Sequence, residues 1–187
     1  MKKSMSVFLI VLAVLALGGC SLYNGLVDKN EGVDQAWSDI NAMLQRRADL
    51  VPNLVSTVKG YAAHEKEVFE SVAEARSKLA GAKTPAEAAE ADAALSGALG
   101  RLLAIAEAYP ELKANENFLR LQDELSGTEN RIAVARKDYN AMVKDYNASI
   151  RRLPASLLAG PLGFEKKDYF EPPAGASAVQ QAPAVSF

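Results

Sequence analysis

The stretch Arg46-Arg47-Ala48-Asp49-Leu50-Val51-Pro52-Asn53-Leu54-Val55 decides how the first half of the chain folds. Apolar residues with helical spacing enter this stretch, cross the proline and leave it in phase. A proline inside a helix removes a hydrogen bond and costs about 3 kcal/mol. Pro52 therefore marks either a kink in a continuous helix or the first turn of a new helix that Asp49 caps. The apolar positions are Val33, Trp37, Ile40, Leu44, Val51, Leu54, Val58, Tyr61, Phe69, Val72 and Leu79.

Two charged residues, Arg47 and Glu65, occupy positions where this apolar pattern predicts core. A buried charge is costly unless it is paired and hydrogen-bonded. In one continuous helix they would lie roughly 27 Å apart, so they could pair only if the chain reversed. Either the apolar face widens and leaves both charges at its edge, or a polar site exists here. The residues of that candidate polar interaction site are Arg46, Arg47, Asp49, Asn53, His64 and Glu65.

The remaining chain predicts further helices separated by clear breaks. Gly81 ends one helix, and Thr84, Pro85 and Glu87 form the signature of a capping box that starts the next. That helix is expected to run to about residue 108, and Tyr109 and Pro110 form the next break. A last helix begins between residues 110 and 115 and runs to about residue 153.

The last helix contains a heptad repeat, because residues 137–143 and 144–150 are identical at five of seven positions. The repeat places Tyr139 and Tyr146 on one face, where we expect core aromatics with hydroxyl groups at the rim. The sequence predicts an all-α fold: an elongated antiparallel helical bundle of three to four long helices. Its first helix is kinked or broken near Pro52, and the tail from residue 171 is expected to be disordered.

The first twenty residues resemble a bacterial lipoprotein signal. Lys2 and Lys3 precede an unbroken apolar run at residues 7–17, and Leu17-Gly18-Gly19-Cys20 follows. This run is shorter than the roughly 20 residues that span a bilayer. We expect cleavage before Cys20 and acylation of its thiol; the alternative is an uncleaved N-terminal membrane anchor. Both place the bundle outside the cytoplasm, and Ser21 after the cysteine suggests the outer membrane in a bacterium with two membranes.

The predicted organisation has four parts. Residues 1–19 are the signal peptide, residues 20–31 the anchor and a short spacer, residues 32–153 the helical bundle, and residues 154–187 a loop and disordered tail. A helix is expected to begin near residues 26–32, with Asp28 or Asn30 as its cap.

Composition excludes several functions. The formal net charge of −2 argues against a nucleic-acid-binding surface, which needs clustered Lys and Arg. Cleavage would remove Lys2 and Lys3 and no acids, so the mature chain would be more acidic still. One cysteine and one histidine leave no disulfide and no His-based metal site within the chain. No nucleophile motif or phosphate-binding loop is present, so we expect no enzyme activity and no cofactor.

Thirteen short motifs resemble, in order over about residues 22–170, the LemA family of bacterial membrane-associated proteins. The resemblance implies an N-terminal membrane anchor and a long antiparallel helical bundle, and it implies no enzyme activity. One branch of the family is associated with magnetosome membranes. The lipobox-like Leu17-Gly18-Gly19-Cys20 departs from the family, which more often suggests a plain transmembrane anchor. The motifs are Tyr23-Asn24, Ala36-Trp37, Arg46-Arg47, Asp49-Leu50-Val51-Pro52-Asn53-Leu54-Val55, Val58-Lys59-Gly60-Tyr61, His64-Glu65, Ala75-Arg76, Glu107-Ala108-Tyr109-Pro110-Glu111-Leu112-Lys113-Ala114, Thr128-Glu129, Ala135-Arg136, Tyr139-Asn140, Tyr146-Asn147 and Gly163-Phe164.

These observations predict a membrane-anchored protein-interaction or scaffold module of the bacterial cell envelope. The expected partners are the membrane, through lipidated Cys20 or the apolar segment, and proteins whose identity the sequence does not give. A homo-oligomer and a structural envelope lipoprotein are the alternatives. Small-molecule binding at the polar residues near Pro52 is the least favoured interpretation.

Overall fold

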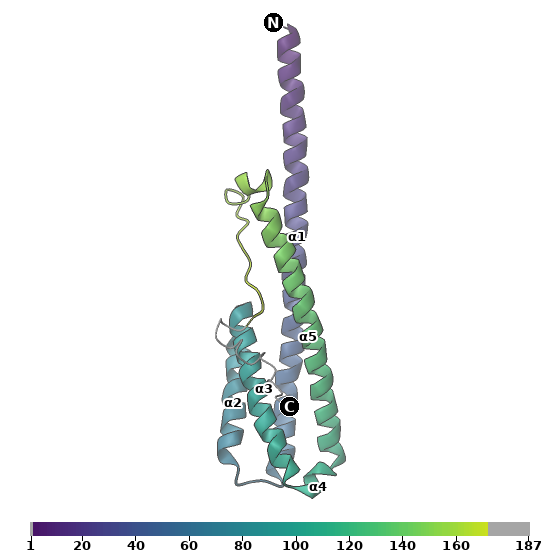
Figure 1. Ribbon diagram of the computed structural model, residues 1–187, viewed down its shortest axis with the longest axis vertical. Coiled ribbons are helices and arrows are strands. Elements are labelled where there is room, and N and C mark those ends of the chain that lie inside the picture. Colours follow the sequence, from purple (N-terminus) through teal and green to yellow (C-terminus); the bar gives the residue numbers. More distant parts are fainter. Residues whose placement is uncertain (1, 172–187) are drawn as a thin grey trace, which may run out of the picture. The chain divides into compact units, whose positions relative to one another are not determined.

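A computed structural model describes residues 2–171 and the side chains of residues 18–171 (Figure 1). The helices are α1 (Lys2–Lys59), α2 (Lys66–Gly81), α3 (Pro85–Glu107), α4 (Pro110–Lys113) and α5 (Glu116–Arg151), followed by the 3-10 turn η1 (Ala155–Leu157). These residues form no strand and four of their helices are long, which confirms the all-α prediction of three to four long helices. Residues 172–187, most of the predicted disordered tail, lie outside the described part.

The predicted break before the third long helix is confirmed. The Glu87 amide donates to the Thr84 hydroxyl oxygen at 3.2 Å, and the Thr84 amide donates to the Glu87 carboxylate at 3.3 Å. Pro85 is the first residue of α3, where its missing amide hydrogen costs nothing. The break at Pro110 also holds, and a single turn, α4, precedes α5. Helix α5 ends at Arg151, two residues before the predicted end.

Two predicted features of the first helix were wrong. Helix α1 begins at Lys2, so residues 21–31 are helical where a spacer was expected. Leu22 and Leu26 extend the apolar spacing backwards from Val33, and no proline interrupts it. At the other end, the apolar pattern predicts helix through Tyr61, with Tyr61 in the core. Instead α1 stops at Lys59, and a turn at residues 60–65 leaves Tyr61 38% exposed. An apolar pattern that stays in phase across a turn looks the same as one continuous helix.

The chain does not reverse at Pro52, which lies inside α1. A proline has no amide hydrogen to donate to the carbonyl four residues earlier, which here belongs to Ala48. Arg76 of α2 fills that role, because its Nε donates to the Ala48 carbonyl oxygen at 2.8 Å. Ala48 is buried, so this hydrogen bond satisfies a group that water cannot reach.

The chain divides into two compact units, which we describe separately. The first unit comprises the described residues of Met1–Ala36 and Ala141–Lys167, and the second comprises those of Trp37–Asn140 and Asp168–Phe187. In the second unit, α2 and α3 pack side by side (Figure 1). Its core includes Ile40, Leu44, Val51, Leu54, Val58, Val72, Leu95, Leu102, Leu112, Phe118 and Ile132. The core of the first unit includes Leu26, Val33, Val143, Tyr146 and Ile150.

Candidate functional site

The structure separates the six residues of the predicted polar site. Arg47 is 3% exposed, so the interpretation that places it at the edge of the apolar face does not hold. Its Nη1 donates to Asp92 of α3 at 2.6 Å, and its Nη2 lies 3.8 Å from a carboxylate oxygen of Glu129 of α5. The buried guanidinium thus connects three helices of the second unit. Its partners are Asp92 and Glu129, and Glu65 lies in the turn before α2.

The other predicted residues lie on the surface of the same unit. Arg46 forms an ion pair with Glu124 of α5 at 2.7 Å, and both side chains are substantially exposed. Asp49 accepts a hydrogen bond from Gln45 one turn earlier on α1. The remaining two, Asn53 and His64, are exposed. Of these six residues, Arg47 therefore belongs to the interior.

Burial controls the electrostatics of the Arg47–Asp92 pair. Burial raises the pKa of the Asp92 carboxyl above its ordinary value, and the Arg47 guanidinium offsets part of that rise. The Asp92 side chain is only 15% exposed. Within the described part of the chain, the Nε of Arg47 is buried without a hydrogen-bond partner. An orphaned donor of this kind retains the capacity to bind an acceptor.

A cavity of about 210 Å³ opens beside this pair, and we call it the Arg47 cavity. Positive and negative side chains both line the cavity, because Glu129 and Arg136 lie there together with Arg47 and Asp92. Alanine side chains in the lining are too small to fill it. Its lining includes Arg47, Asp92, Ser96, Glu129, Arg136 and Phe170. Sequence reasoning missed Asp92, although the signal was available: Asp92 interrupts the apolar spacing of α3 between Ala88 and Leu95, as Arg47 does on α1.

The heptad repeat of α5 places a Tyr–Asn pair in each unit, and each pair holds an extended segment by its main chain. In the second unit, the Tyr139 hydroxyl donates to the carbonyl oxygen of Asp168 at 2.8 Å. The Asn140 side chain both donates to the Phe170 carbonyl, at 3.3 Å, and accepts from the Phe170 amide, at 2.9 Å. We call this arrangement a Tyr–Asn clamp.

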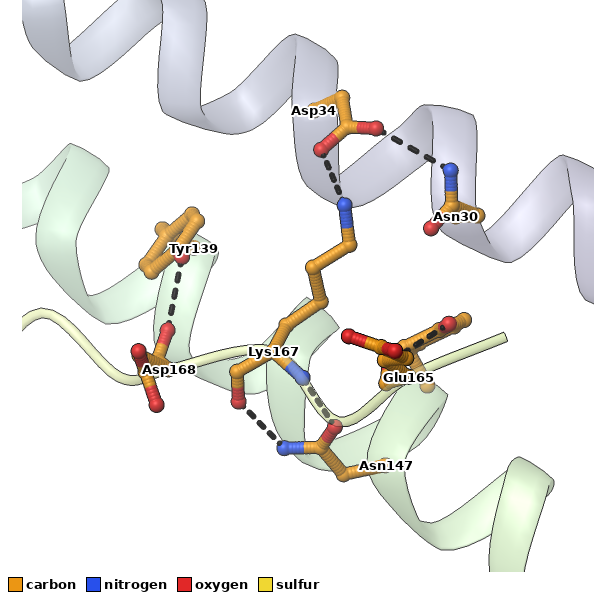
Figure 2. A network of polar contacts seen from close by, with 8 residues as sticks. Asn30, Asp34, Tyr139, Asn147, Glu165, Lys167 and Asp168 are labelled. Atoms are coloured by element: carbon orange, nitrogen blue, oxygen red, sulfur yellow. Dashed lines mark hydrogen bonds and ion pairs between the residues drawn. The ribbon is translucent and has the colours of Figure 1, made fainter. Parts of the chain in front are cut away.

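The first unit contains the same arrangement one heptad later. The Tyr146 hydroxyl donates to the Glu165 carbonyl at 2.9 Å. The Asn147 side chain donates to the Lys167 carbonyl and accepts from the Lys167 amide, each at 2.9 Å (Figure 2). Burial, with Asp34 and Glu165 nearby, raises the pKa of Tyr146, so its hydroxyl stays a donor. Both tyrosines are core aromatics, as predicted, but the hydrogen bonds of their hydroxyl groups and the role of the asparagines were missed.

The predicted lipidation residue, Cys20, is an exposed free cysteine on α1. Ser21, the next residue, lies at the edge of a groove of about 260 Å³ in the first unit. The lining of this groove includes Leu22, Leu26, Lys29, Arg152 and Leu153. Among residues that the structure describes, no helix combines the length and apolar character needed to cross a membrane. The same residues contain no group of three or more His, Cys, Asp or Glu arranged to hold a metal ion.

Comparisons with known proteins identify the family of this chain. A model of the LemA family matches residues 36–187. Magnetosome proteins MamQ 1 and MamQ 2 of Paramagnetospirillum magneticum are each 31% identical to this chain, over 88% of it and 71% of their own length. Protein LemA of Metamycoplasma hominis is 30% identical over 60% of this chain and 52% of its own length. The chain therefore belongs to the LemA family.

Proposed function

We propose that this protein is a non-enzymatic, membrane-anchored interaction or scaffold module of the bacterial cell envelope. The observation that carries the proposal is the Arg47 cavity, a charged recess in the second unit. Its buried guanidinium has an unpaired Nε, and Glu129 and Arg136 stand exposed beside it. A polar side chain of a partner protein that enters the recess can accept from Arg47 and pair with either exposed charge.

The membrane anchor is the second part of the proposal. Residues 1–19 are removed as a signal peptide, Cys20 is acylated, and residues 32–153 form the functional bundle outside the cytoplasm. In a bacterium with two membranes the protein resides in the outer one. Membership of a membrane-associated family, the lipobox-like residues and the exposure of the Cys20 thiol support this arrangement. Acylation by two or three chains anchors firmly, whereas one chain binds marginally.

Site-specific photo-crosslinking in intact cells tests the interaction. A photoreactive residue replaces Arg136 at the cavity, and a matched control replaces Glu74, an exposed residue on α2 of the same unit. We expect a defined crosslinked product from position 136 and a different pattern from position 74. The double substitution Arg47→Met/Asp92→Leu, which replaces the ion pair with apolar groups of similar size, should abolish the product at 136. Identical products at both positions, or a product that survives the double substitution, would contradict the proposal.

An oligomerising structural lipoprotein is the second candidate function. Leu119 and Val134 are large apolar residues on α5 of the second unit, and both are exposed. Such side chains can pack against a second copy. We expect full-length protein in detergent to sediment as a dimer or larger species, and Val134→Glu to shift it toward monomer. A monomer at every concentration would exclude this candidate.

A further inference from the structure

The first unit exposes four leucines within ten residues. Leu153 is 77% exposed, Leu157 70%, Leu158 41% and Leu162 47%. We call residues 153–162 the leucine turn. Leucine is usually buried, and a run of exposed leucines marks an interaction surface.

The leucine turn is ordered by its own main chain. The Ala159 amide donates to the Ala155 carbonyl at 2.8 Å, and the Leu162 amide donates to the Leu158 carbonyl at 3.0 Å. Ala155 and Ala159 are buried. The small residues therefore face the unit, and the exposure of the leucines follows from the fold of the turn.

The leucine turn lies beside the residues that immediately follow the predicted anchor. Leu22 and Leu153 line the same groove, and the rings of Tyr23 and Phe164 meet edge to face with centroids 5.7 Å apart. At about 1.5 Å per residue, Tyr23 is roughly 5 Å along α1 from Cys20. Both anchoring mechanisms, an acylated Cys20 or an uncleaved apolar segment at residues 7–17, bring the chain out of the bilayer just before this point.

The charges around the leucine turn suit a lipid surface. Residues 151–164 contain two arginines and no acid, although the chain as a whole is acidic. Arg151 and Arg152 are exposed at the start of the turn, the oppositely charged Glu165 and Lys166 are exposed just after it, and Tyr23 is exposed on α1. Leucines flanked by basic residues and an aromatic ring are the composition of segments that lie in the bilayer interface.

We propose that the leucine turn inserts into the surface of the bilayer that holds the N-terminus, as a second membrane contact. The ligand is the phospholipid surface: its outer acyl methylenes receive the four leucines, and its phosphates pair with Arg151 and Arg152. This inference rests on the proposed membrane anchoring. Two contacts fix how the first unit stands on the membrane, whereas a single point of attachment would leave it free to rotate.

Quenching by brominated lipid tests the second contact. Full-length protein, extracted from the membranes of the expressing bacterium, is reconstituted into phosphatidylcholine vesicles with or without bromine on the acyl chains. Leu157→Trp reports on the turn, and Met142→Trp is the matched control, since Met142 is also exposed, apolar and part of the first unit. The native Trp37 gives the same background in both variants.

We expect brominated lipid to quench the added tryptophan at 157 at least about two-fold more strongly than the one at 142. Equal quenching at 157 and 142, in protein that floats with the vesicles, would overturn the second contact and leave the anchor intact. Protein that fails to float with the vesicles in every variant would overturn the anchor and the second contact together.

Discussion

The buried Arg47–Asp92 pair determines how the second unit responds to single substitutions. Removing one partner of a buried ion pair leaves the other charge without compensation. We expect Asp92→Ala to lower the free energy of unfolding by about 3 kcal/mol. Asp92→Asn also removes the charge but keeps an oxygen that accepts from Arg47, so its loss should be smaller than that of Asp92→Ala by about 1 kcal/mol. Urea unfolding at neutral pH measures both, and equal losses would show that the hydrogen bond to Arg47 contributes little.

The raised pKa of Asp92 gives a pH dependence of defined sign. Burial raises this pKa above 3.8 in the folded protein, so the folded chain binds more protons than the unfolded chain just above that value. The contribution of Asp92 to the free energy of unfolding therefore falls as pH rises from the pKa of this carboxyl in the unfolded chain to its pKa in the folded protein. We expect the unfolding free energy of the unmodified protein, minus that of Asp92→Asn, to decrease as pH rises above 3.8. A difference that increases with pH would mean that Arg47 dominates over burial.

At the scale of the helices, Pro52 and Arg76 form a coupled pair through the Ala48 carbonyl. Arg76→Leu leaves that buried carbonyl without a donor and should cost about 1–3 kcal/mol. Pro52→Ala restores an amide that can donate to Ala48 along the helix, so Arg76→Leu should cost much less in that background. Chemical unfolding of the four proteins gives the coupling energy. Additive losses would show that the arginine stabilises α1 and α2 by other contacts.

The Tyr–Asn clamp of the first unit predicts a local effect on the extended segment after the leucine turn. Asn147→Ala removes two hydrogen bonds to Lys167 and should cost about 2 kcal/mol. Because the segment is then held less firmly, trypsin should cleave after Lys166 and Lys167 faster than in the unmodified protein. Asn24→Ala, an exposed asparagine of the same unit, is the control. Equal cleavage rates in all three proteins would show that the clamp does not hold this segment.

The sequence predicted the structural features that depend on neighbouring residues, and it missed the contacts between residues far apart in the chain. The capping box at Thr84 and the break at Pro110 involve residues within a few positions of each other, so their patterns were sufficient. Arg47 was recognised as a charge at a core position, but its partner Asp92 is 45 residues away, and no local pattern links them. The extended segment held by Asn147 has no periodicity of its own, so the heptads of α5 predicted the tyrosines and not what they bind.

At the scale of the whole molecule, the proposed lipoprotein anchor predicts the intact mass of the protein. The chain has one cysteine, Cys20, and it is exposed at the point where a lipoprotein signal would end. We expect the intact mass of protein from bacterial membranes to lack residues 1–19 and to include acyl chains. The Cys20→Ser variant should retain residues 1–19 and carry no acyl chain, because it lacks the thiol that the proposed acylation requires.

An unmodified protein that retains residues 1–19 without an acyl chain would mean that the apolar run at residues 7–17 is itself the anchor. That outcome would exclude the lipoprotein mechanism and keep the leucine turn at the bilayer, because both mechanisms release the chain from the membrane just before Leu22. The mass measurement and the quenching measurement therefore test separate attachments. A chain held by both should stay on vesicles at high salt, since acyl and leucine contacts are apolar and salt screens only the arginines.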